Sequence, residues 1–260
     1  MPGGQRFEGR VAIVTGGSGG LGGAICAAFA DEGAALAVVD VQTQAAERAA
    51  AELRERGSAA RAFGCDVSDP GSVGAMVEGV ATALGPPGVL VNAAGGSLGT
   101  PRDLADIAPE HLDLVLDVNL KGTFLCAQAV VPHMRAAGGG SIVNVSSIGG
   151  RSASPVTGVP YAAAKSGVLG LTRRLAREVG PWHIRVNAVA PGLFLSGPRL
   201  AGMWDALSED ERREVLDAIP LRRMPELSEA AAPVLYLASD EASYVTGAIL
   251  DVNGGRFMSG

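Results

Sequence analysis

A tyrosine and a lysine in this sequence are spaced so that they can act together on a proton. Tyr161 and Lys165 stand at positions i and i+4 of YAAAKSGVLGLTRRLAREVG, which has helical spacing, so their side chains share one face. A free phenol has a pKa of about 10 and is a poor base at neutral pH. A nearby ammonium favours the phenolate, so we expect Lys165 to lower the pKa of Tyr161. Such a pair can exchange a proton with an alcohol or a ketone while hydride moves to or from a nicotinamide.

Ser147 is the third candidate for this chemistry. It ends SIVNVSS, an apolar run typical of a buried strand, shortly before Tyr161. Its hydroxyl can hold the oxygen of a substrate. Taken alone, a serine at a strand end is more often a turn residue, and a Tyr-x-x-x-Lys pair is more often an ordinary helix surface. The functional interpretation depends on position, because the pair opens the helix that follows this strand.

The glycine-rich stretch TGGSGGLGG at 15–23 lies between the apolar run RVAIV and a helix-like segment. A flexible linker has no reason to stand there. A nucleophile elbow around Ser18 would need earlier strands and an oxyanion loop upstream, and a Walker loop would need a lysine after the glycines. A loop whose backbone N–H groups bind a pyrophosphate fits best, because residues 17–22 spell G-x-G-x-x-G between a strand and a helix.

Asp40 ends the second apolar run, ALAVVD, about twenty residues after the glycines. A carboxylate at this place accepts hydrogen bonds from the ribose diol of NAD and repels the 2′-phosphate of NADP. No lysine or arginine stands within 15–23, or at Val41 or Gln42, to offset that repulsion. The sequence therefore predicts NAD as the cofactor, and an Asp that merely caps the following turn is the alternative.

Short apolar runs alternate with helix-like segments along the chain. Such alternation predicts βαβ units, and near-continuous apolar strands predict a parallel sheet with helices on both faces. We expect an α/β fold with a doubly wound, seven-stranded parallel sheet, and one domain over residues 1–260. The predicted strands are 10–15, 35–40, 61–67, 88–95, 141–147, 184–192 and 248–255. The predicted helices include 44–57, one that Asp69 caps, 109–137 with a break near Asn119, and 161–180.

The charge balance and the cysteine pattern argue against several classes of function. With 21 Lys and Arg against 27 Asp and Glu the net charge is −6, which does not suit a nucleic-acid-binding protein. The 3 cysteines form no CxxC and the 3 histidines join no ligand cluster, so we expect neither disulfides nor a metal site. The first residues lack an apolar signal region, and no apolar run reaches the roughly 20 residues of a membrane span. We expect a cytoplasmic protein with no membrane partner.

Taken together, the motifs resemble the short-chain dehydrogenase/reductase family over nearly the whole chain. In order they are TGGSGGLG, CDV, NAAG, VNLKG, NVSS, YAAAK and VAPG. The resemblance implies a Rossmann-type fold and a catalytic tetrad of Asn119, Ser147, Tyr161 and Lys165. In that scheme Tyr161 is the acid or base, Lys165 lowers its pKa and holds the nicotinamide ribose, and Asn119 orders a water that relays protons.

The resemblance also implies how NAD would be held. Asp66 and Val67 would flank the adenine, Asn92 and Ala93 the ribose, and 191–194 with Ser196 the carboxamide. The full set of expected cofactor contacts is Gly16, Ser18, Gly20, Leu21, Gly22, Asp40, Asp66, Val67, Asn92, Ala93, Gly95, Tyr161, Lys165, Pro191, Gly192, Phe194 and Ser196. In two respects the chain departs from the family pattern. Ala93 replaces a commoner Asn and is expected to loosen the sheet, and an enlarged loop between Ser147 and Tyr161 leaves substrate specificity open.

The resemblance leaves the substrate undecided. We expect an NAD-dependent oxidoreductase that interconverts a small or medium secondary alcohol and a ketone, with a lid over about 193–225 whose apolar residues line the pocket or pack on the body. A 3-oxoacyl reductase that uses NADPH and acts on acyl-carrier protein is the alternative, although the two docking positions of such enzymes fall on Gly138 and Trp182, which are not basic. A non-catalytic dinucleotide-binding regulator is an alternative of another class. By analogy with relatives, we expect a homotetramer.

Overall fold

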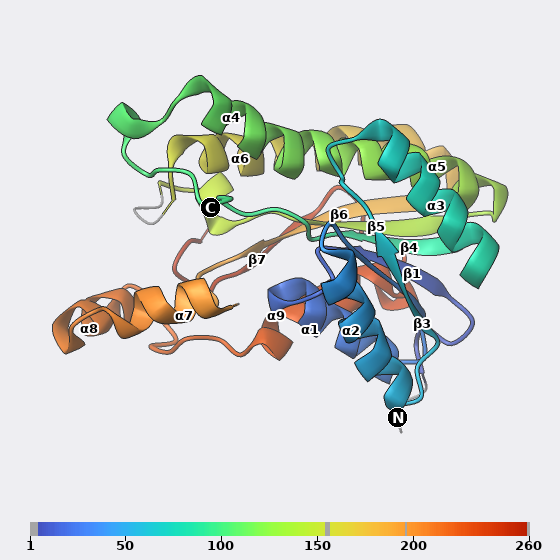
Figure 1. Ribbon diagram of the computed structural model, residues 1–260, viewed down its shortest axis with the longest axis horizontal. Helices are drawn as coiled ribbons and strands as arrows, with labels where there is room; N and C mark the ends of the chain where they lie inside the picture. The colour runs from blue at the N-terminus through green and yellow to red at the C-terminus, as the bar shows by residue number, and fades with distance from the viewer. Residues whose placement is uncertain (1–4, 154–156, 196, 259–260) are drawn as a thin grey trace.

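The sheet is the feature that positions every candidate residue. The computed structural model describes residues 5–153, 157–195 and 197–258, except for the side chains of 198, 199 and 203. Seven parallel strands pair in the order β3-β2-β1-β4-β5-β6-β7 (Figure 1). They are β1 Val11–Thr15, β2 Ala35–Asp40, β3 Ala60–Gly64, β4 Pro87–Asn92, β5 Gly140–Val145, β6 Ile184–Pro191 and β7 Ile249–Val252. The doubly wound parallel sheet is therefore confirmed, and its strand order reverses between β1 and β4, where such folds bind ligands.

Helices cover both faces of the sheet. They are α1 Gly20–Asp31, α2 Thr43–Glu55, α3 Pro70–Leu84, α4 Pro109–Leu116, α5 Gly122–Ala136, α6 Val159–Val179, α7 Pro198–Asp205, α8 Glu209–Asp217 and α9 Leu227–Ala238. One layer holds α3, α4, α5 and α6, the other holds α1, α2 and α9, and α7 and α8 extend from one end (Figure 1). The predicted cap of α3 is confirmed, because the Asp69 carboxylate accepts the N–H groups of Gly71 and Ser72.

Two apolar clusters fill the space between the sheet and these layers. The first joins the strands to α1, α2 and α9, and the second joins them to α3, α5 and α6. All residues of β1 are buried, which explains why its sequence is a continuous apolar run rather than an alternating one. Several strands end earlier than predicted, β5 at Val145 and β4 at Asn92. The motif residues that follow them are therefore loops at the carboxyl edge of the sheet.

The stretch from 109 to 136 does not break at Asn119 as predicted. The chain passes from α4 into α5 through one π-helical turn, Asp117–Lys121. Together these segments, Pro109–Ala136, are long and apolar enough to cross a membrane by length and composition alone. Core helices of globular proteins pass the same test, and α5 packs against α3 and the strands β4 and β5. The stretch is thus part of the helical layer that covers one face of the sheet.

Candidate active site

The glycine loop forms a close-packed turn between β1 and α1. Gly16 has a φ of +67°, and a Cβ there would lie 2.9 Å from the Cα of Ala94. A Cβ on Gly22 would lie 2.1 Å from the carbonyl oxygen of Gly16, so the helix can approach the strand only without a side chain. Around Gly19 the space is open, with nothing within 4 Å of a Cβ. Gly20 and the half-buried Leu21 then begin α1, whose free N–H groups can receive a pyrophosphate.

Asp40 faces this loop from the end of β2. The Ser18 hydroxyl donates to Asp40 Oδ2 at 2.6 Å, and the N–H of Gln42 donates to Oδ1 at 3.0 Å. Oδ2 also accepts the N–H of Ser18 at 3.4 Å, whereas Oδ1 keeps a further acceptor position for a ribose hydroxyl. Among the described residues, Asp40 has no ion pair with a lysine or an arginine. The glycine loop and Asp40 thus form a cradle that fits the pyrophosphate and the ribose of a dinucleotide.

Asp66 and Val67, the residues expected at the adenine, differ in the groups that a cofactor could contact. The Asp66 carboxylate accepts the hydroxyl and the N–H of Ser68 at 2.7 Å and 2.9 Å, and these hydrogen bonds lower its pKa. Val67 is buried, and a Cβ on Gly122 would lie 2.7 Å from its Cγ2. The Val67 side chain therefore belongs to the core, and its main chain remains for a cofactor contact.

The Asn92 side chain is buried and belongs to a network of hydrogen bonds inside the fold. Its Nδ2 donates to Asn144 Oδ1 at 2.9 Å, and Asn144 Nδ2 donates to Thr172 Oγ1 at 2.9 Å. These bonds tie β4 and β5 to α6, so a ribose contact at Asn92 would come from its main chain. Nearby, the Thr15 hydroxyl accepts the N–H groups of both Ala93 and Ala94 at 3.1 Å. Thr15 holds this part of the edge in place, beside the Ala93 that was expected to loosen the sheet.

Asn119 lies fully buried in the π-helical turn. Its Nδ2 donates to the carbonyls of Val115 and Gly96, and its Oδ1 accepts the N–H of Gly96 at 2.9 Å. A Cβ on Gly95 would lie 2.3 Å from that Oδ1, which explains why glycine, with a φ of +136°, stands there. The Asn119 side chain thus fixes the loop after β4. A water relay through this residue stays a prediction, and it would have to use groups other than these side-chain bonds.

Ser147, Tyr161 and Lys165 are brought together at the carboxyl end of β5. Tyr161 lies in the first turn of α6, and a side-chain hydrogen bond links it to Ser147. Lys165 lies one turn later, with its Nζ 5.7 Å from the centre of the Tyr161 ring. The Lys165 side chain is only 4% exposed, and its Nζ donates to the carbonyl of Val145 at 2.8 Å. The predicted cluster of a hydroxyl, a phenol and an amine is therefore present in the fold.

The pKa of Tyr161 differs from the sequence-based expectation. Burial raises it, and the hydrogen bond from Ser147 offsets the rise only in part. Burial also lowers the pKa of Lys165 to about 8. The expected lowering of the Tyr161 pKa by Lys165 is therefore wrong for the protein alone, because desolvation dominates and the amine bonds to the main chain of Val145 instead.

The loop after β6 carries the residues expected at the carboxamide. Pro191 ends the strand, and the N–H of Gly192 donates to the carbonyl of Val252 at 2.9 Å. Phe194 is buried, and Ser196 lies outside the described residues. Beyond it, the lid residue Trp204 is covered by Arg212, whose Cζ lies 5.7 Å from the indole ring. Trp204 thus packs within the lid itself.

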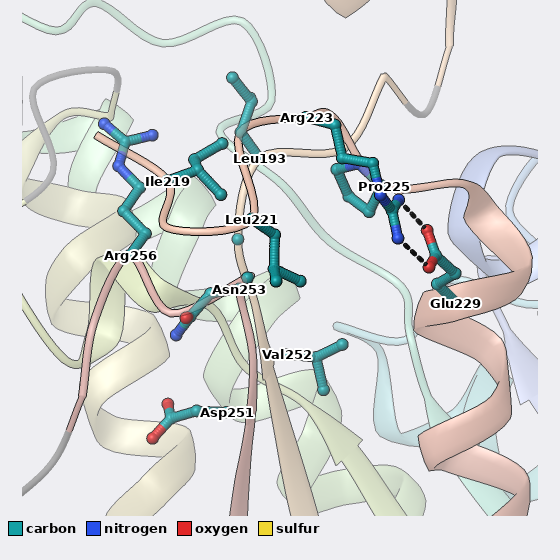
Figure 2. Close-up of a pocket in the computed structure, with 12 residues that line it drawn as sticks. Leu193, Ile219, Leu221, Arg223, Pro225, Glu229, Asp251, Val252, Asn253 and Arg256 are labelled. Atoms are coloured by element: carbon teal, nitrogen blue, oxygen red, sulfur yellow. Dashed lines mark hydrogen bonds and ion pairs between the residues drawn. The ribbon is translucent and has the colours of Figure 1, made fainter. Parts of the chain in front are cut away.

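A cavity of about 240 Å³ borders this loop at Gly192 and Leu193. Figure 2 shows Ile219 and Leu221 of the returning lid on one side and the end of β7 on the other, with Arg223 paired to Glu229 beyond. None of its lining residues belongs to the group of Ser147, Tyr161 and Lys165. The cavity therefore borders the loop expected at the carboxamide and is separate from the group of Ser147, Tyr161 and Lys165.

Sequence reasoning missed the buried polar residues whose hydrogen bonds hold the site residues in place. Thr15, Asn144 and Thr172 carry the buried hydrogen bonds described above, yet each stands in an apolar strand or helix. The signal was available, because a polar residue in a continuous apolar strand must find a buried partner. Their partners lie on other elements, so the sequence alone could not identify them.

Comparisons with known proteins agree with this geometry. A family model described as Enoyl-(Acyl carrier protein) reductase matches residues 16–256. The chain is 40% identical over 253 residues to a 3-oxoacyl-(acyl-carrier-protein) reductase FabG of Thermotoga maritima, covering 96% of this chain and 99% of the relative. It is 39% identical to a D-threitol dehydrogenase of Mycolicibacterium smegmatis, covering 96% and 94%. A 3-oxoacyl-(acyl-carrier protein) reductase of Brucella melitensis with bound NAD has a TM-score of 0.88 at 35% identity, covering 99% and 94%.

Proposed function

Since the chain belongs to the short-chain dehydrogenase/reductase family, a family of oxidoreductases, we propose that it interconverts a secondary alcohol and a ketone with NAD as the cofactor. The observation that carries this proposal is the contact of Ser147 with Tyr161 beside the buried amine of Lys165. A non-catalytic dinucleotide-binding protein could use Lys165 to hold the ribose, but it would not need the hydroxyl of Ser147 beside the phenol of Tyr161.

Tyr161 is the group that moves the proton in this proposal. Its hydroxyl, with a raised pKa, is protonated at neutral pH and is ready to donate to a ketone oxygen. In the reverse direction it must give up its own proton before it can accept one from an alcohol. Ser147 then holds the substrate oxygen next to the phenol, since its hydroxyl already interacts with Tyr161. Lys165 provides the positive charge that favours the phenolate once its Nζ leaves the Val145 carbonyl.

NAD fits the cradle of this chain better than NADP. Gly16, Gly20 and Gly22 let the backbone approach a pyrophosphate, and the Asp40 carboxylate can accept the ribose diol. When bound, the nicotinamide accepts or supplies the hydride. A 2′-phosphate would meet the Asp40 charge, and among the described residues no lysine or arginine pairs with that carboxylate. The NAD bound to the Brucella melitensis relative is in keeping with this choice.

The carrier-protein reductase remains the second candidate, and one contact favours it. Neither Gly138 nor Trp182 is basic, but the guanidinium of Arg135 lies over the Trp182 ring, 4.5 Å from its centre. A cation is therefore present where enzymes of that kind would meet an acidic carrier. The match to a 3-oxoacyl-(acyl-carrier-protein) reductase points the same way, whereas the match to D-threitol dehydrogenase favours a small polyol or alcohol.

We place the enzyme in the cytoplasm as a homotetramer. Large apolar side chains are exposed on α4 and α5 (Leu112, Leu114 and Phe124) and around β7 and α9 (Tyr236, Tyr244 and Leu250). Exposed large apolar side chains are a feature of interfaces between subunits. Two such surfaces on different elements would give two symmetry axes, as a tetramer requires.

A side-by-side assay of the two cofactors tests the proposal. Purified protein is given secondary alcohols, polyols, ketones and an acetoacetyl thioester, with NAD(H) and NADP(H) in parallel, and absorbance of the reduced cofactor is recorded. We expect turnover of an alcohol and ketone pair with NAD(H) only. Preferential reduction of the thioester with NADPH would establish the second candidate and contradict the role given to Asp40. Binding of NAD without turnover of any compound would favour a non-catalytic role.

A further inference from the structure

The turn that presents Ser147 rests directly on the helix that carries Lys165. Ser147 begins a single turn of 3-10 helix, Ile148–Gly150, and its Oγ accepts the N–H of Gly149 at 3.0 Å. A Cβ on Gly150 would lie 2.6 Å from the carbonyl carbon of Lys165. The hydroxyl of Ser166 donates to the Gly150 carbonyl at 3.0 Å. A shift at the far end of this turn would therefore move Ser147 relative to Lys165.

Arg151 is the residue at that far end, and it does not point into solvent. Its Nη2 donates to Asp251 Oδ2 at 2.9 Å, across a separation of one hundred positions in the chain. The two side chains are only 14% and 19% exposed. Exposed ion pairs contribute little, but removal of one partner of a buried pair leaves an uncompensated charge. This partly buried pair therefore links the end of the Ser147 turn to the last strand.

Two atoms of the pair have room for a second bond. Arg151 Nε and Asp251 Oδ1 are buried, and neither has a hydrogen-bond partner among the described residues. Arginine and carboxylate groups favour a two-bond arrangement, and these are the two atoms that a second bond would join. Figure 2 shows the Asp251 carboxylate directed away from Arg223 and Glu229, which pair with each other.

The C-terminal tail also contacts Arg151. The Phe257 ring lies with its centre 5.1 Å from the Arg151 Cζ, a cation–π contact. The buried Asn253 folds the tail into this position, since its Oδ1 accepts the N–H groups of Gly255 and Phe257 and its Nδ2 donates to the Phe257 carbonyl. The tail is therefore held in a defined conformation over the guanidinium.

We propose that Arg151, Asp251 and Phe257 form a clasp that positions the Ser147 turn against Lys165. The last strand and the tail then contribute to catalysis without touching substrate, and the three residues are positioning residues. The part of this inference that concerns turnover rests on the proposed function. The part that concerns the conformation of the turn does not.

The test compares Arg151→Met, Asp251→Asn, the double variant and Phe257→Leu with the unaltered protein. Amide hydrogen exchange over residues 149–152 is followed without substrate, and kcat, KM and the Kd for NAD are measured on the best substrate. We expect Arg151→Met to raise exchange and to lower kcat by about ten-fold or more, because small misplacements of catalytic groups are costly. The Kd for NAD should stay within about two-fold, since the cradle lies on other strands.

The double variant tests whether the residues act as one unit. If they do, it should be no worse than Arg151→Met, because the second change removes a contact that is already lost. Arg151→Lys keeps the charge and should recover part of kcat, which a merely space-filling role would not allow. Arg174→Met is the matched control, since it removes an exposed pair with Glu178 and should change neither readout.

Several results would overturn the proposal. One is unchanged exchange together with unchanged kcat in a folded Arg151→Met protein, and another is additive losses in the double variant. If Arg151→Met does not fold, Phe257→Leu and Arg151→Lys decide the question by the same readouts. If the unaltered protein turns over nothing, the proposed function fails, and the exchange experiment still supports or contradicts the clasp.

Discussion

Lys165 is a buried amine, and its burial lowers the stability of the fold at neutral pH. The side chain is 4% exposed, and burial lowers its pKa from 10.5 to about 8. Keeping the protonated amine in the fold at neutral pH therefore costs about 3 kcal/mol. A hydrogen bond to the Val145 carbonyl returns only about 1 kcal/mol of this. Under the proposed function, this cost is accepted because the reaction needs a cation beside Tyr161.

A substitution at this residue should make the protein more stable and inactive. Below pH 8 both the folded and the unfolded lysine are protonated, so Lys165→Met should raise the free energy of unfolding by about 2 kcal/mol. Between about pH 8 and 10.5 the folded amine loses its proton first, so the stability of the unaltered protein rises relative to the variant and the gap closes. Urea unfolding at pH 7 and pH 9.5 measures both effects.

The chain offers a matched control, because Lys121 is its only other lysine and is exposed. Lys121→Met should change stability little at either pH. Two results would contradict this explanation. One is a Lys165→Met protein that is less stable than the unaltered protein at pH 7. The other is a difference in free energy of unfolding between the two proteins that is the same at pH 7 and pH 9.5.

Among the elements, the junction of β1 and α1 allows the least change. A Cβ on Gly22 would lie 2.1 Å from the Gly16 carbonyl oxygen, which is backbone and cannot rotate away. We expect Gly22→Ala to lower the free energy of unfolding by about 2 kcal/mol and to weaken NAD binding, because the helix must move off the strand. Thermal unfolding and NAD titration by calorimetry check this.

The neighbouring Gly23 provides the control for that experiment. It lies in the same helix, and a Cβ there would come no closer than 3.8 Å to another atom. Gly23→Ala should keep NAD binding and raise stability by up to about 1 kcal/mol through helix propensity. If both variants behaved alike, the close approach at Gly22 would not be what requires glycine.

Most of these elements could be predicted from the sequence, because apolar periodicity and capping residues are local signals. The seven strands, their parallel arrangement and the cap at Asp69 are confirmed. The π-helical turn at Asn119 was predicted as a break, since no sequence pattern separates the two. The contact of Arg151 with Asp251 depends on tertiary structure and could not be found. The predicted direction of the Tyr161 pKa shift was wrong, because the burial of a side chain cannot be judged from residue spacing alone.

Exposed apolar side chains on α4 and α5 argue for association between subunits. Phe124 is 45% exposed there, and Leu114 is exposed to the same extent. We expect Phe124→Glu to convert a tetramer into dimers, because a charge in an apolar interface is costly to bury. Light scattering after size-exclusion chromatography measures the mass. Leu104→Glu, at an exposed position outside this stretch, should leave the mass unchanged.

In the proposed mechanism Tyr161 moves the proton, while the glycine loop and Asp40 hold the pyrophosphate and the adenosine ribose of NAD. The most direct test measures the Kd for NAD and the turnover of the same Tyr161→Phe preparation. We expect the Kd to stay within about two-fold, because the glycine loop and Asp40 are untouched, and turnover to fall by about a hundred-fold or more. Turnover that survives the loss of the hydroxyl would contradict the mechanism. Loss of NAD binding would mean that Tyr161 contributes mainly to binding the cofactor and not to proton transfer.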